Sequence, residues 1–458
     1  MKKLFGTDGM RGEAGKFPLD AATVEIVGAS LANHLREKLG RAPLIVVGRD
    51  TRESGPWMEQ ALARGATAAG ADLQSGGVIT TPGVAYLARS LSADAGVVIS
   101  ASHNPYQDNG LKIFAPGGRK LDEETERLIE KDIFAKTEIL SAADGKGSET
   151  TPLVANTIDT KALQSRYVDF LINEIARGLA LTGIKLVVDC ANGAASAIAP
   201  DLLQQLGATV VAINNTPDGR NINLNCGSLH TEQLQSEVLN QHADLGVAFD
   251  GDADRSLFVD AKGQLINGDG TLWVLAKYLH ARNELTNNAV VATVMSNIGL
   301  ELALKSRGLT LVRTDVGDKY VLDELLRSGA TLGGEQSGHI ILPRLSLAGD
   351  GLITTLSLLR VMAEENKSLS QLAEGFEVFP QILVNVKVAQ KRPFNEFEEI
   401  NNVTHKIESE LGSRGRLLLR YSGTESLARV MIEGESQSQI EAFADQLARV
   451  IKETLGKL

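Results

Sequence analysis

Three aspartates, Asp250, Asp252 and Asp254, alternate with small residues in a segment that has apolar runs on both sides. Alternate residues of an extended strand lie about 6.6 Å apart, whereas Mg²⁺ binds its oxygen ligands at about 2.1 Å. We therefore expect the segment to form a loop around one cation, with Gly251 permitting the bend. Without a cation, two of these carboxylates about 4 Å apart would repel each other by about 4 kcal/mol at an effective dielectric constant of about 20.

Two other structures could explain this acidic segment, an EF-hand calcium loop and a solvated acidic turn. An EF-hand calcium loop does not fit, because Arg255 stands where that loop needs glycine and Ala261 stands where it needs glutamate. A solvated acidic turn stays open, although the apolar runs on both sides favour a buried site.

A serine follows another apolar run, residues 96–99. This places Ser102 at the carboxyl end of an expected strand, where α/β sheets bind their ligands. The adjacent His103 does not form a hydrolase pair with it, because consecutive side chains point apart and no G-x-S-x-G motif surrounds the serine. Lys112 adds a cation nearby. The alternative is an Asn-Pro loop held by its own local hydrogen bonds.

A polar loop near the end of the chain combines hydroxyl groups, a glycine and two guanidinium groups. Its residues are Arg420, Ser422, Gly423, Thr424 and Arg429. Successive backbone N–H groups in such a loop form a nest for an anion, and arginine binds phosphate through two parallel hydrogen bonds. An ordinary turn with exposed arginines is the alternative.

Another glycine-flanked loop carries a carboxylate, a hydroxyl and an imidazole, at Glu335, Ser337 and His339. Glutamate and serine in alternation suit two neighbouring hydroxyls of a sugar. A single histidine is more often structural than functional, but its neighbours in this loop favour a role in the site.

Two further polar segments carry cations. Arg11 lies in a glycine-rich loop near the start of the chain, and Arg49, Asp50 and Arg52 follow a strand-like run. The second group can equally be a structural cluster of ion pairs.

The elements that would position these loops follow a repeating pattern. Strand-like runs at 44–47, 185–189 and 289–294 each end in a polar turn, and each is followed about two dozen residues later by a glycine and a second strand. Short buried strands that alternate with helices predict βαβ units with largely parallel sheets. Three such echoes in order favour triplication of one α/β domain.

The last part of the chain has a different pattern, strand, helix, strand, strand, helix, which predicts an α+β domain. Residues 136–160 are polar with few large apolar side chains, as expected of a linker. We therefore predict three similar mixed α/β domains and a C-terminal α+β domain, with limits at residues 1–150, 151–256, 257–372 and 373–458.

Composition excludes several classes of protein. The 458 residues carry a net charge of −11, which argues against a broad surface for nucleic acid or anionic membranes. Only Cys190 and Cys226 are present, so a disulfide scaffold is excluded and a cytoplasmic protein is expected. We expect neither a signal peptide nor a membrane span, because no apolar run is suitable. A P-loop, a convincing G-x-G-x-x-G and an H-E-x-x-H are all absent.

Together the motifs resemble those of the α-D-phosphohexomutase family over essentially the whole chain. The four signatures of that family stand in order: a serine loop at 101–105, a metal loop at 250–255, a sugar loop at 334–339 and a phosphate loop at 420–429. Within the family, the opening loop and the sugar loop with Gln336 look most like those of the bacterial phosphoglucosamine mutases.

The resemblance implies four domains around a central cleft and a phosphoserine at Ser102. It implies one Mg²⁺ per subunit, held by Asp250, Asp252, Asp254 and an oxygen of that phosphoserine. The implied reaction interconverts glucosamine 6-phosphate and glucosamine 1-phosphate, which feeds UDP-N-acetylglucosamine synthesis. Glucosamine 1,6-bisphosphate or glucose 1,6-bisphosphate would serve as intermediate and activator, and a homodimer is expected.

The resemblance also implies roles for the other candidate residues. Arg11, Lys112 and Arg255 are expected to stabilise the anionic transition state, and Lys112 or His339 to move a proton. Glu335 and Ser337 would hold the sugar. The loop with Arg420, Ser422, Gly423, Thr424 and Arg429 would bind the phosphate that does not react.

Two departures from the family pattern bear on these expectations. Ser426 replaces a proline of the phosphate loop, which predicts weaker pre-organisation, and the stretch 340–346 is atypical, which bears on amino-sugar selectivity. The alternatives are a phosphomannomutase/phosphoglucomutase with the same mechanism, a sugar-phosphate phosphatase, or a non-catalytic sensor.

Overall fold

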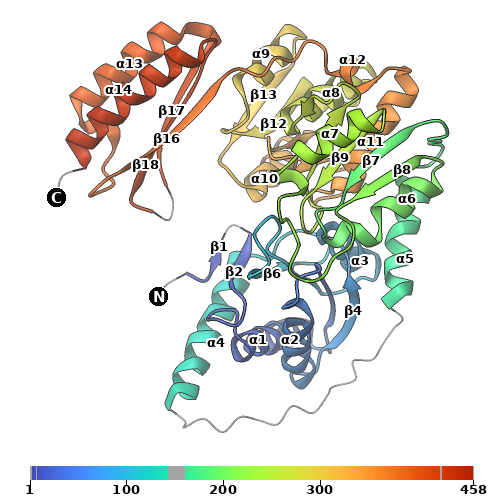
Figure 1. Cartoon of the computed structure of the whole chain (residues 1–458). Helices are drawn as coiled ribbons and strands as arrows, with labels where there is room; N and C mark the ends of the chain where they lie inside the picture. Colours follow the sequence, from blue (N-terminus) through green and yellow to red (C-terminus); the bar gives the residue numbers. More distant parts are fainter. Residues whose placement is uncertain (1–2, 7, 143–159, 423–424, 457–458) are drawn as a thin grey trace. The chain divides into compact units, whose positions relative to one another are not determined.

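The computed structural model describes residues 3–6, 8–142, 160–422 and 425–456, and of residues 137–142 it describes the backbone alone. The chain forms two compact units. The first consists of Met1–Val294 and Val312–Glu374, and the second of Met295–Leu311 and Gly375–Leu458. Figure 1 shows the order of the elements along the chain.

The first sheet has six strands in the order β1-β2-β6-β5-β3-β4. Strands β3, β4 and β5 run parallel, whereas β1, β2 and β6 pair antiparallel. The strands are β1 (Phe5–Gly6), β2 (Gly9–Glu13), β3 (Leu44–Arg49), β4 (Asp72–Val78), β5 (Ala95–Ile99) and β6 (Asp108–Phe114). The helices are α1 (Ala21–Leu39), α2 (Gly55–Ala68), α3 (Thr81–Ser90) and α4 (Glu123–Ala142).

Both faces of strand β3 are buried, which explains its continuous apolar run. Ile45 and Val47 belong to the core shared with α1, α2 and α4, while Val46 between them points to the other face and is also buried. Helices α1 and α2 pack closely through Gly28 of α1 and Gly65 of α2. A Cβ at Gly28 would lie 2.2 Å from the Leu62 carbonyl oxygen, so only glycine fits there.

The second sheet has five strands in the order β11-β10-β9-β7-β8, with β7 parallel to both β8 and β9. The strands are β7 (Lys185–Asp189), β8 (Thr209–Ile213), β9 (Leu245–Phe249), β10 (Ser256–Asp260) and β11 (Leu265–Ile266). The helical segments are α5 (Thr160–Phe170), the π-helix η1 (Leu171–Ile175), α6 (Ala199–Gln205), α7 (Glu232–Asn240), and the 3₁₀ turns η2 (Ala194–Ala197) and η3 (Gly227–Leu229).

The third sheet has the order β13-β12-β14-β15. Its strands are β12 (Ala289–Thr293), β13 (Thr310–Thr314), β14 (Gly333–Gly334) and β15 (Ile340–Ile341). The helices in this part of the chain are α8 (Gly268–Ala281), η4 (Thr286–Asn288), α9 (Ile298–Ser306), α10 (Asp318–Ser328), α11 (Gly351–Glu365) and α12 (Leu369–Ala373).

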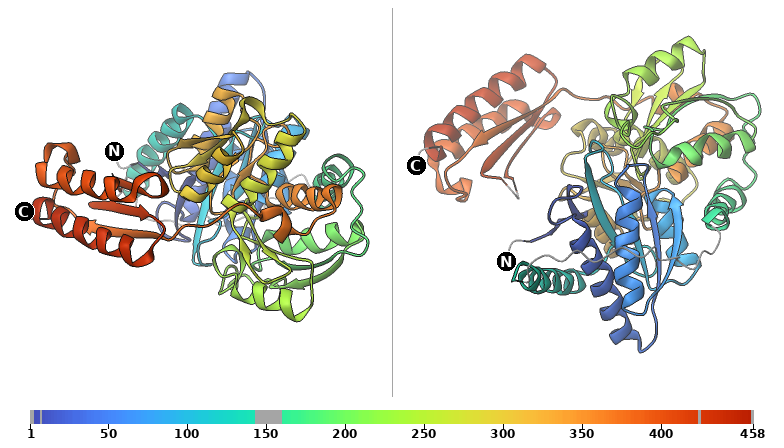
Figure 2. Two further views of the ribbon diagram at one scale, coloured as in Figure 1. Left: turned by 90° about the horizontal axis from the view of Figure 1, so that it is seen from above. Right: turned by 60° about the horizontal axis from the view of Figure 1, so that its bottom comes forward.

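The fourth sheet is antiparallel, in the order β16-β18-β17. Its elements are β16 (Gln381–Lys387), η5 (Phe394–Glu396), α13 (Glu398–Leu411), η6 (Gly412–Arg414), β17 (Arg416–Tyr421), β18 (Leu427–Glu433) and α14 (Gln437–Leu455). Helices α13 and α14 cover one face of the sheet (Figures 1 and 2). Their apolar sides form its core, which includes Ile400, Ile407, Leu447 and Ile451.

The predicted fold class, three mixed α/β domains and a smaller α+β domain, is confirmed. Most of the predicted linker at 136–160 lies outside the described residues. The predicted limit between residues 256 and 257 would cut β10 after its first residue and divide its five-residue antiparallel pairing with β9. We therefore propose that the second domain continues through β11.

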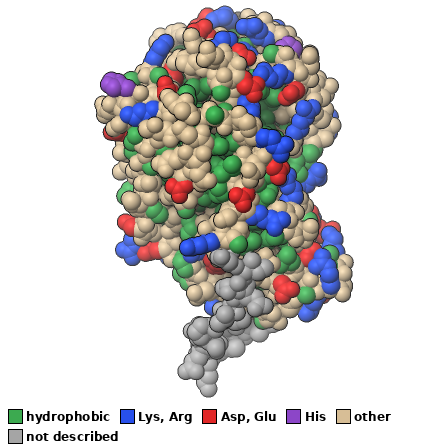
Figure 3. Space-filling view, turned by 90° about the vertical axis from the view of Figure 1, so that its right-hand side faces the viewer, with side chains coloured by type: hydrophobic (Ala, Val, Ile, Leu, Met, Phe, Trp, Pro, Cys, Tyr) green, Lys and Arg blue, Asp and Glu red, His purple; other side chains and the backbone are tan. Residues whose placement is uncertain are grey.

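The charged side chains are mixed on the face shown in Figure 3, where Lys and Arg lie among Asp and Glu. That face therefore lacks the broad basic patch that nucleic-acid binding requires. Among the residues that the structure describes, none of the helices combines the length and apolar character needed to cross a membrane.

Candidate active site

Ser102 lies just beyond the end of β5, in a left-handed backbone conformation with φ of 53°. Its side chain is buried, and its Oγ donates a hydrogen bond to Asp250 Oδ2 at 2.5 Å. This conformation is sterically unfavourable for residues other than glycine, so contacts with the surrounding structure must stabilise it. The contact joins two loops that are 148 residues apart in the chain.

The acidic loop connects β9 to β10, and its three aspartates converge. Asp250, Asp252 and Asp254 are buried, and each offers an oxygen within 4.8 Å of the others. Ala253, with φ of 56°, supplies the left-handed residue of this loop, rather than Gly251 as expected. Gly251 is needed for another reason, since a Cβ there would lie 2.5 Å from the carbonyl oxygen of Ser102.

The oxygens of this cluster fit a divalent cation. Asp252 Oδ1 and Asp254 Oδ1 are buried and accept no hydrogen bond. Burial and the charges of Asp254 and Asp252 raise the pKa of Asp250 well above its usual range, and the charge of Arg255 offsets them only in part. Hard carboxylate oxygens in such a cluster are the ligands that Mg²⁺ and Ca²⁺ prefer.

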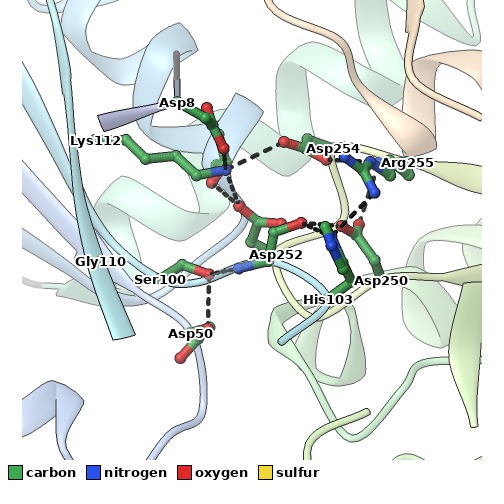
Figure 4. A network of polar contacts seen from close by, with 12 residues as sticks. Asp8, Asp50, Ser100, His103, Gly110, Lys112, Asp250, Asp252, Asp254 and Arg255 are labelled. Carbon is green, nitrogen blue, oxygen red and sulfur yellow. Dashed lines mark hydrogen bonds and ion pairs between the residues drawn. The ribbon is translucent and has the colours of Figure 1, made fainter. Parts of the chain in front are cut away.

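Lys112 reaches from β6 into the acidic cluster (Figure 4). Its Nζ lies 2.8 Å from Asp252 Oδ2, 3.3 Å from Asp254 Oδ2 and 3.2 Å from Asp8 Oδ2. Burial by itself would lower the pKa of Lys112, but these carboxylates outweigh it and raise the pKa well above its usual value. Lys112 is therefore a buried, permanently charged cation.

His103 lies beside Ser102, and Arg255 contacts that histidine. The Ser102 Oγ is 3.2 Å from His103 Nδ1, so the prediction that these two side chains point apart is wrong. The Arg255 Nη1 donates to His103 Nδ1 at 3.0 Å, so that ring nitrogen carries no proton. Burial and the charges of Arg255 and Arg11 lower the pKa of His103 to about 4. The buried Nε groups of Arg11 and Arg255 donate no hydrogen bond, which leaves both available to an anion.

The loop between β14 and β15 presents the sugar-loop residues. Glu335 Oε1 accepts a hydrogen bond from the Gly317 N–H at 3.1 Å, and Ser337 Oγ donates to Glu335 Oε2 at 3.3 Å. His339 lies 3.6 Å from Asp254 Oδ1 and 3.9 Å from Asp318 Oδ2.

These carboxylates decide the charge of His339. Burial opposes the charged ring, but attraction by Asp254, together with Asp318 and Glu335, raises the pKa of His339 to about 9. The histidine is therefore an imidazolium that links the metal loop to the sugar-loop region.

A cavity of about 410 Å³ lies among these loops. Predicted site residues from all three α/β sheets line it: Arg11, Arg255, Glu335 and His339. Asp8 and Asp318 line it as well and were not predicted, although both lie in polar loops that the sequence marks. Lys120, which pairs with both at 2.8 and 2.6 Å, has no sequence signal.

The phosphate-loop residues lie in the second compact unit. Arg420 of β17 stands directly opposite Arg429 of β18, and Arg429 Nη2 donates to Ser422 Oγ at 3.4 Å. The buried Nε of Arg429 donates no hydrogen bond. Like charges directly opposite each other on paired strands are unfavourable, and Glu425 Oε2, which lies 3.6 Å from Arg429 Nη2, offsets part of this repulsion. Gly423 and Thr424 lie outside the described residues.

Comparison with known sequences gives the same four-part division. The alpha/beta/alpha domains I, II and III and the C-terminal domain of phosphoglucomutase/phosphomannomutase match residues 2–140, 165–263, 267–379 and 383–450. A phosphoglucosamine mutase of Solibacter usitatus is 46% identical over 456 residues, with all of both chains covered. Another, of Desulforamulus reducens, is 47% identical and covers 98% of this chain and 99% of its own.

Solved structures have the same fold. A phosphoglucomutase/phosphomannomutase family protein of Burkholderia thailandensis aligns with a TM-score of 0.79 at 27% identity, covering 98% of this chain and 97% of its own. The N-acetylphosphoglucosamine mutase of Aspergillus fumigatus aligns with a TM-score of 0.66 at 20% identity, covering 98% and 95%. The chain therefore belongs to the phosphoglucomutase/phosphomannomutase family, the α-D-phosphohexomutases that its motifs resemble.

Proposed function

We propose that this chain is a mutase that interconverts glucosamine 6-phosphate and glucosamine 1-phosphate through a phosphoserine and a 1,6-bisphosphate. The observation that carries the proposal is the position of Ser102, whose Oγ lies 2.5 Å from an aspartate of a buried acidic cluster. Relatives that are phosphoglucosamine mutases, 43–47% identical over the full chain, favour the amino sugar over other hexose phosphates.

Ser102 would carry the phosphoryl group. In the first half-reaction the bond from phosphorus to Ser102 Oγ breaks, a bond to the free hydroxyl of the sugar forms, and the hydroxyl proton ends on the seryl oxygen. The bisphosphate then turns over, and its other phosphoryl group returns to Ser102. One donor that can face either end of the sugar is sufficient for both directions.

The acidic cluster would hold one Mg²⁺ per subunit through Asp250, Asp252 and Asp254, together with an oxygen on phosphorylated Ser102. When bound, this ion would supply positive charge that neutralises the transferring phosphoryl group. An A. fumigatus N-acetylphosphoglucosamine mutase, which shares the fold, has been solved with GlcNAc-6P and magnesium.

The cations around the cluster would complete the site. Arg11, Lys112 and Arg255 would stabilise the charge that develops on the phosphoryl oxygens. The raised pKa of Lys112 suits it to charge stabilisation, whereas His339, whose pKa is raised to about 9, would be the group that gives a proton to a leaving oxygen.

The sugar and its second phosphate would be held by other residues. Glu335 and Ser337 would bind sugar hydroxyls in both orientations. Arg420, Ser422 and Arg429, with Gly423 and Thr424, would hold the non-reacting phosphate, which converts remote binding energy into positioning. A homodimer, a cytoplasmic location and activation by glucosamine or glucose 1,6-bisphosphate belong to this proposal.

A coupled assay with Mg²⁺ and glucosamine 6-phosphate tests the function, alongside mannose 1-phosphate and glucose 1-phosphate as competing substrates. We expect the highest kcat/KM with the amino sugar, and intact-mass measurement should find a phosphoryl group on Ser102. Higher kcat/KM with mannose 1-phosphate would refute the amino-sugar assignment. Release of inorganic phosphate without isomerisation would identify a phosphatase instead.

A further inference from the structure

We propose that Arg52 is a positioning residue for phosphoryl transfer, which with Asp50 and Ser100 fixes both backbone polar groups of Ser102. The inference rests on the proposed function of Ser102 as the phosphoryl carrier. The sequence leaves open whether Asp50 and Arg52 belong to the functional site or form a structural ion pair, and the proposal gives them a role in the site.

The Arg52 side chain is fully buried, and all five of its N–H donors are used. Its Nε donates to Asp50 Oδ2 at 2.8 Å. The other four donors all reach backbone carbonyl oxygens of the serine loop: Ser102 at 2.9 Å, Asn104 at 2.8 Å, Asp108 at 3.0 Å, and Pro105. One planar guanidinium therefore fixes the path of the loop over seven residues, 102–108.

The N–H side of Ser102 is fixed by the same network. The Ser102 N–H donates to Ser100 Oγ at 2.9 Å, and Ser100 Oγ donates in turn to Asp50 Oδ2 at 2.7 Å. Figure 4 shows Asp50 and Ser100 joined in this way, beneath the acidic cluster. Asp50 therefore orients both the arginine and the serine that hold Ser102.

A second side chain, Asn223 from the segment that follows β8, also donates to the serine loop. Asn223 Nδ2 donates to the carbonyl oxygens of Ser102 and Asn104, at 2.8 and 3.0 Å. The carbonyl of Ser102 thus accepts two hydrogen bonds from different parts of the chain, which resists rotation of its peptide group.

This concentration of hydrogen bonds matters because Ser102 has a positive φ. Without the network the residue would relax toward an ordinary conformation, and its Oγ would move away from Asp250. A misplacement of about 1 Å at a reacting group can cost on the order of 100-fold in rate. A buried ion pair is by itself weak evidence for stability. The donors of the Arg52–Asp50 pair converge on the loop of the reacting serine, which indicates a role in positioning Ser102.

Two variants test the proposal in the full-length phosphorylated protein. Ser100→Ala removes the acceptor of the Ser102 N–H, and Arg52→Lys keeps the charge but loses the planar fork. We expect kcat to fall by about 10- to 100-fold in each, with KM within about twofold, because neither residue is expected to contact the sugar. In the full-length dephosphorylated protein, the rate at which Ser102 takes up a phosphoryl group from glucose 1,6-bisphosphate, followed by intact mass, should fall equally.

Ser30→Ala is the matched control. Ser30 is also a buried serine that donates to a carboxylate, Asp132 Oδ2 at 2.6 Å, but it lies on α1. We expect kcat of this variant to stay within about twofold of the wild type, at a temperature where all variants are folded. If Arg52→Lys does not fold, Ser100→Ala decides the outcome.

An unchanged kcat in Ser100→Ala, a rise in KM alone, or an equal loss in Ser30→Ala would overturn the proposal. The proposed function can fail separately. A wild type that takes up the phosphoryl group on Ser102 but does not convert glucosamine 6-phosphate would refute only the function, and the uptake rates would still test Arg52. A wild type that takes up no phosphoryl group would refute both.

Discussion

Replacing Asp250 by asparagine should stabilise the metal-free protein and, at the same time, remove its stabilisation by Mg²⁺. The change is almost isosteric, and the asparagine Oδ1 can still accept the hydrogen bond from Ser102 Oγ. The variant therefore loses one negative charge of the acidic cluster, and its amide group can no longer accept the Arg255 N–H that donates to Asp250 Oδ1 at 3.2 Å.

The size of the effect follows from the geometry. Carboxylate oxygens 4.8 Å apart repel each other by about 3.5 kcal/mol at an effective dielectric constant of about 20, and Asp250 has two such neighbours. Attraction by Arg255 and loss of a charged hydrogen-bond acceptor offset most of this. We expect a net gain of about 1–2 kcal/mol, which corresponds to a rise in Tm of about 2–5 °C for a domain of this size.

Thermal unfolding in EDTA and in Mg²⁺ measures both effects. A ligand at about 100 times its Kd stabilises the wild type by about 2.7 kcal/mol, and Asp250→Asn should lose most of that response. Asp260→Asn is the matched control, because Asp260 is buried on the same hairpin but accepts hydrogen bonds from Lys262, Gln264 and Ser370. Its Tm in EDTA should fall or stay constant.

The pH dependence of stability tests independently whether the charge of Asp250 destabilises the metal-free protein. The pKa of Asp250 is raised in the folded state, so its protonation favours folding at low pH, and that contribution is lost as the pH rises through the raised value. The difference in Tm between Asp250→Asn and the wild type in EDTA should therefore be larger at neutral pH than in acid. A lower Tm in EDTA than the wild type at neutral pH, or a retained response to Mg²⁺, would refute the reasoning.

Three further predictions concern the carrier, the phosphate loop and the helix packing. Ser102→Ala should abolish turnover, while its Tm and circular dichroism match the wild type; residual mutase activity would contradict the assignment of the carrier. Arg420→Ala should raise KM severely and slow transfer, with kcat/KM lower by about 10- to 100-fold because a charged hydrogen bond contributes about 1.5–3 kcal/mol, and unchanged kinetics would place the phosphate contact elsewhere. Gly28→Ala would by helix propensity stabilise α1 by about 1 kcal/mol, but the new Cβ would lie 2.2 Å from the Leu62 carbonyl oxygen. We expect a lower Tm in a thermal melt, since overpacking costs about 1–3 kcal/mol, and a higher Tm would show that the helices can separate without loss.

The chemistry of the site could be predicted because it is concentrated in short segments. The three alternating aspartates lie within five residues, and a serine at the end of a buried strand faces the ligand edge of a sheet for a purely local reason. The role of Gly251 could not be predicted in this way. Its lack of a side chain makes room for the carbonyl of Ser102, a neighbour that only folding brings there.

The ion pairs around the cavity were missed for the same reason. Lys112 was predicted as a cation, but its partner Asp8 and the bridge from Asp8 through Lys120 to Asp318 join parts of the chain that are 100 to 200 residues apart. Charge and burial of the separate residues do not identify the partners, because many acidic side chains could satisfy one lysine.

The chain's residue order is enough to specify the three α/β units, the C-terminal α+β domain and the chemical groups that each loop carries. Hydrophobic period and turn residues act over a few neighbours, so they can be read without the fold. Packing of the sheets decides which loops meet: it brings Ser102 to Asp250, and it gives the donors of Arg52 to four carbonyls of the serine loop. Such pairings depend on distances through space, which covalent order alone does not constrain.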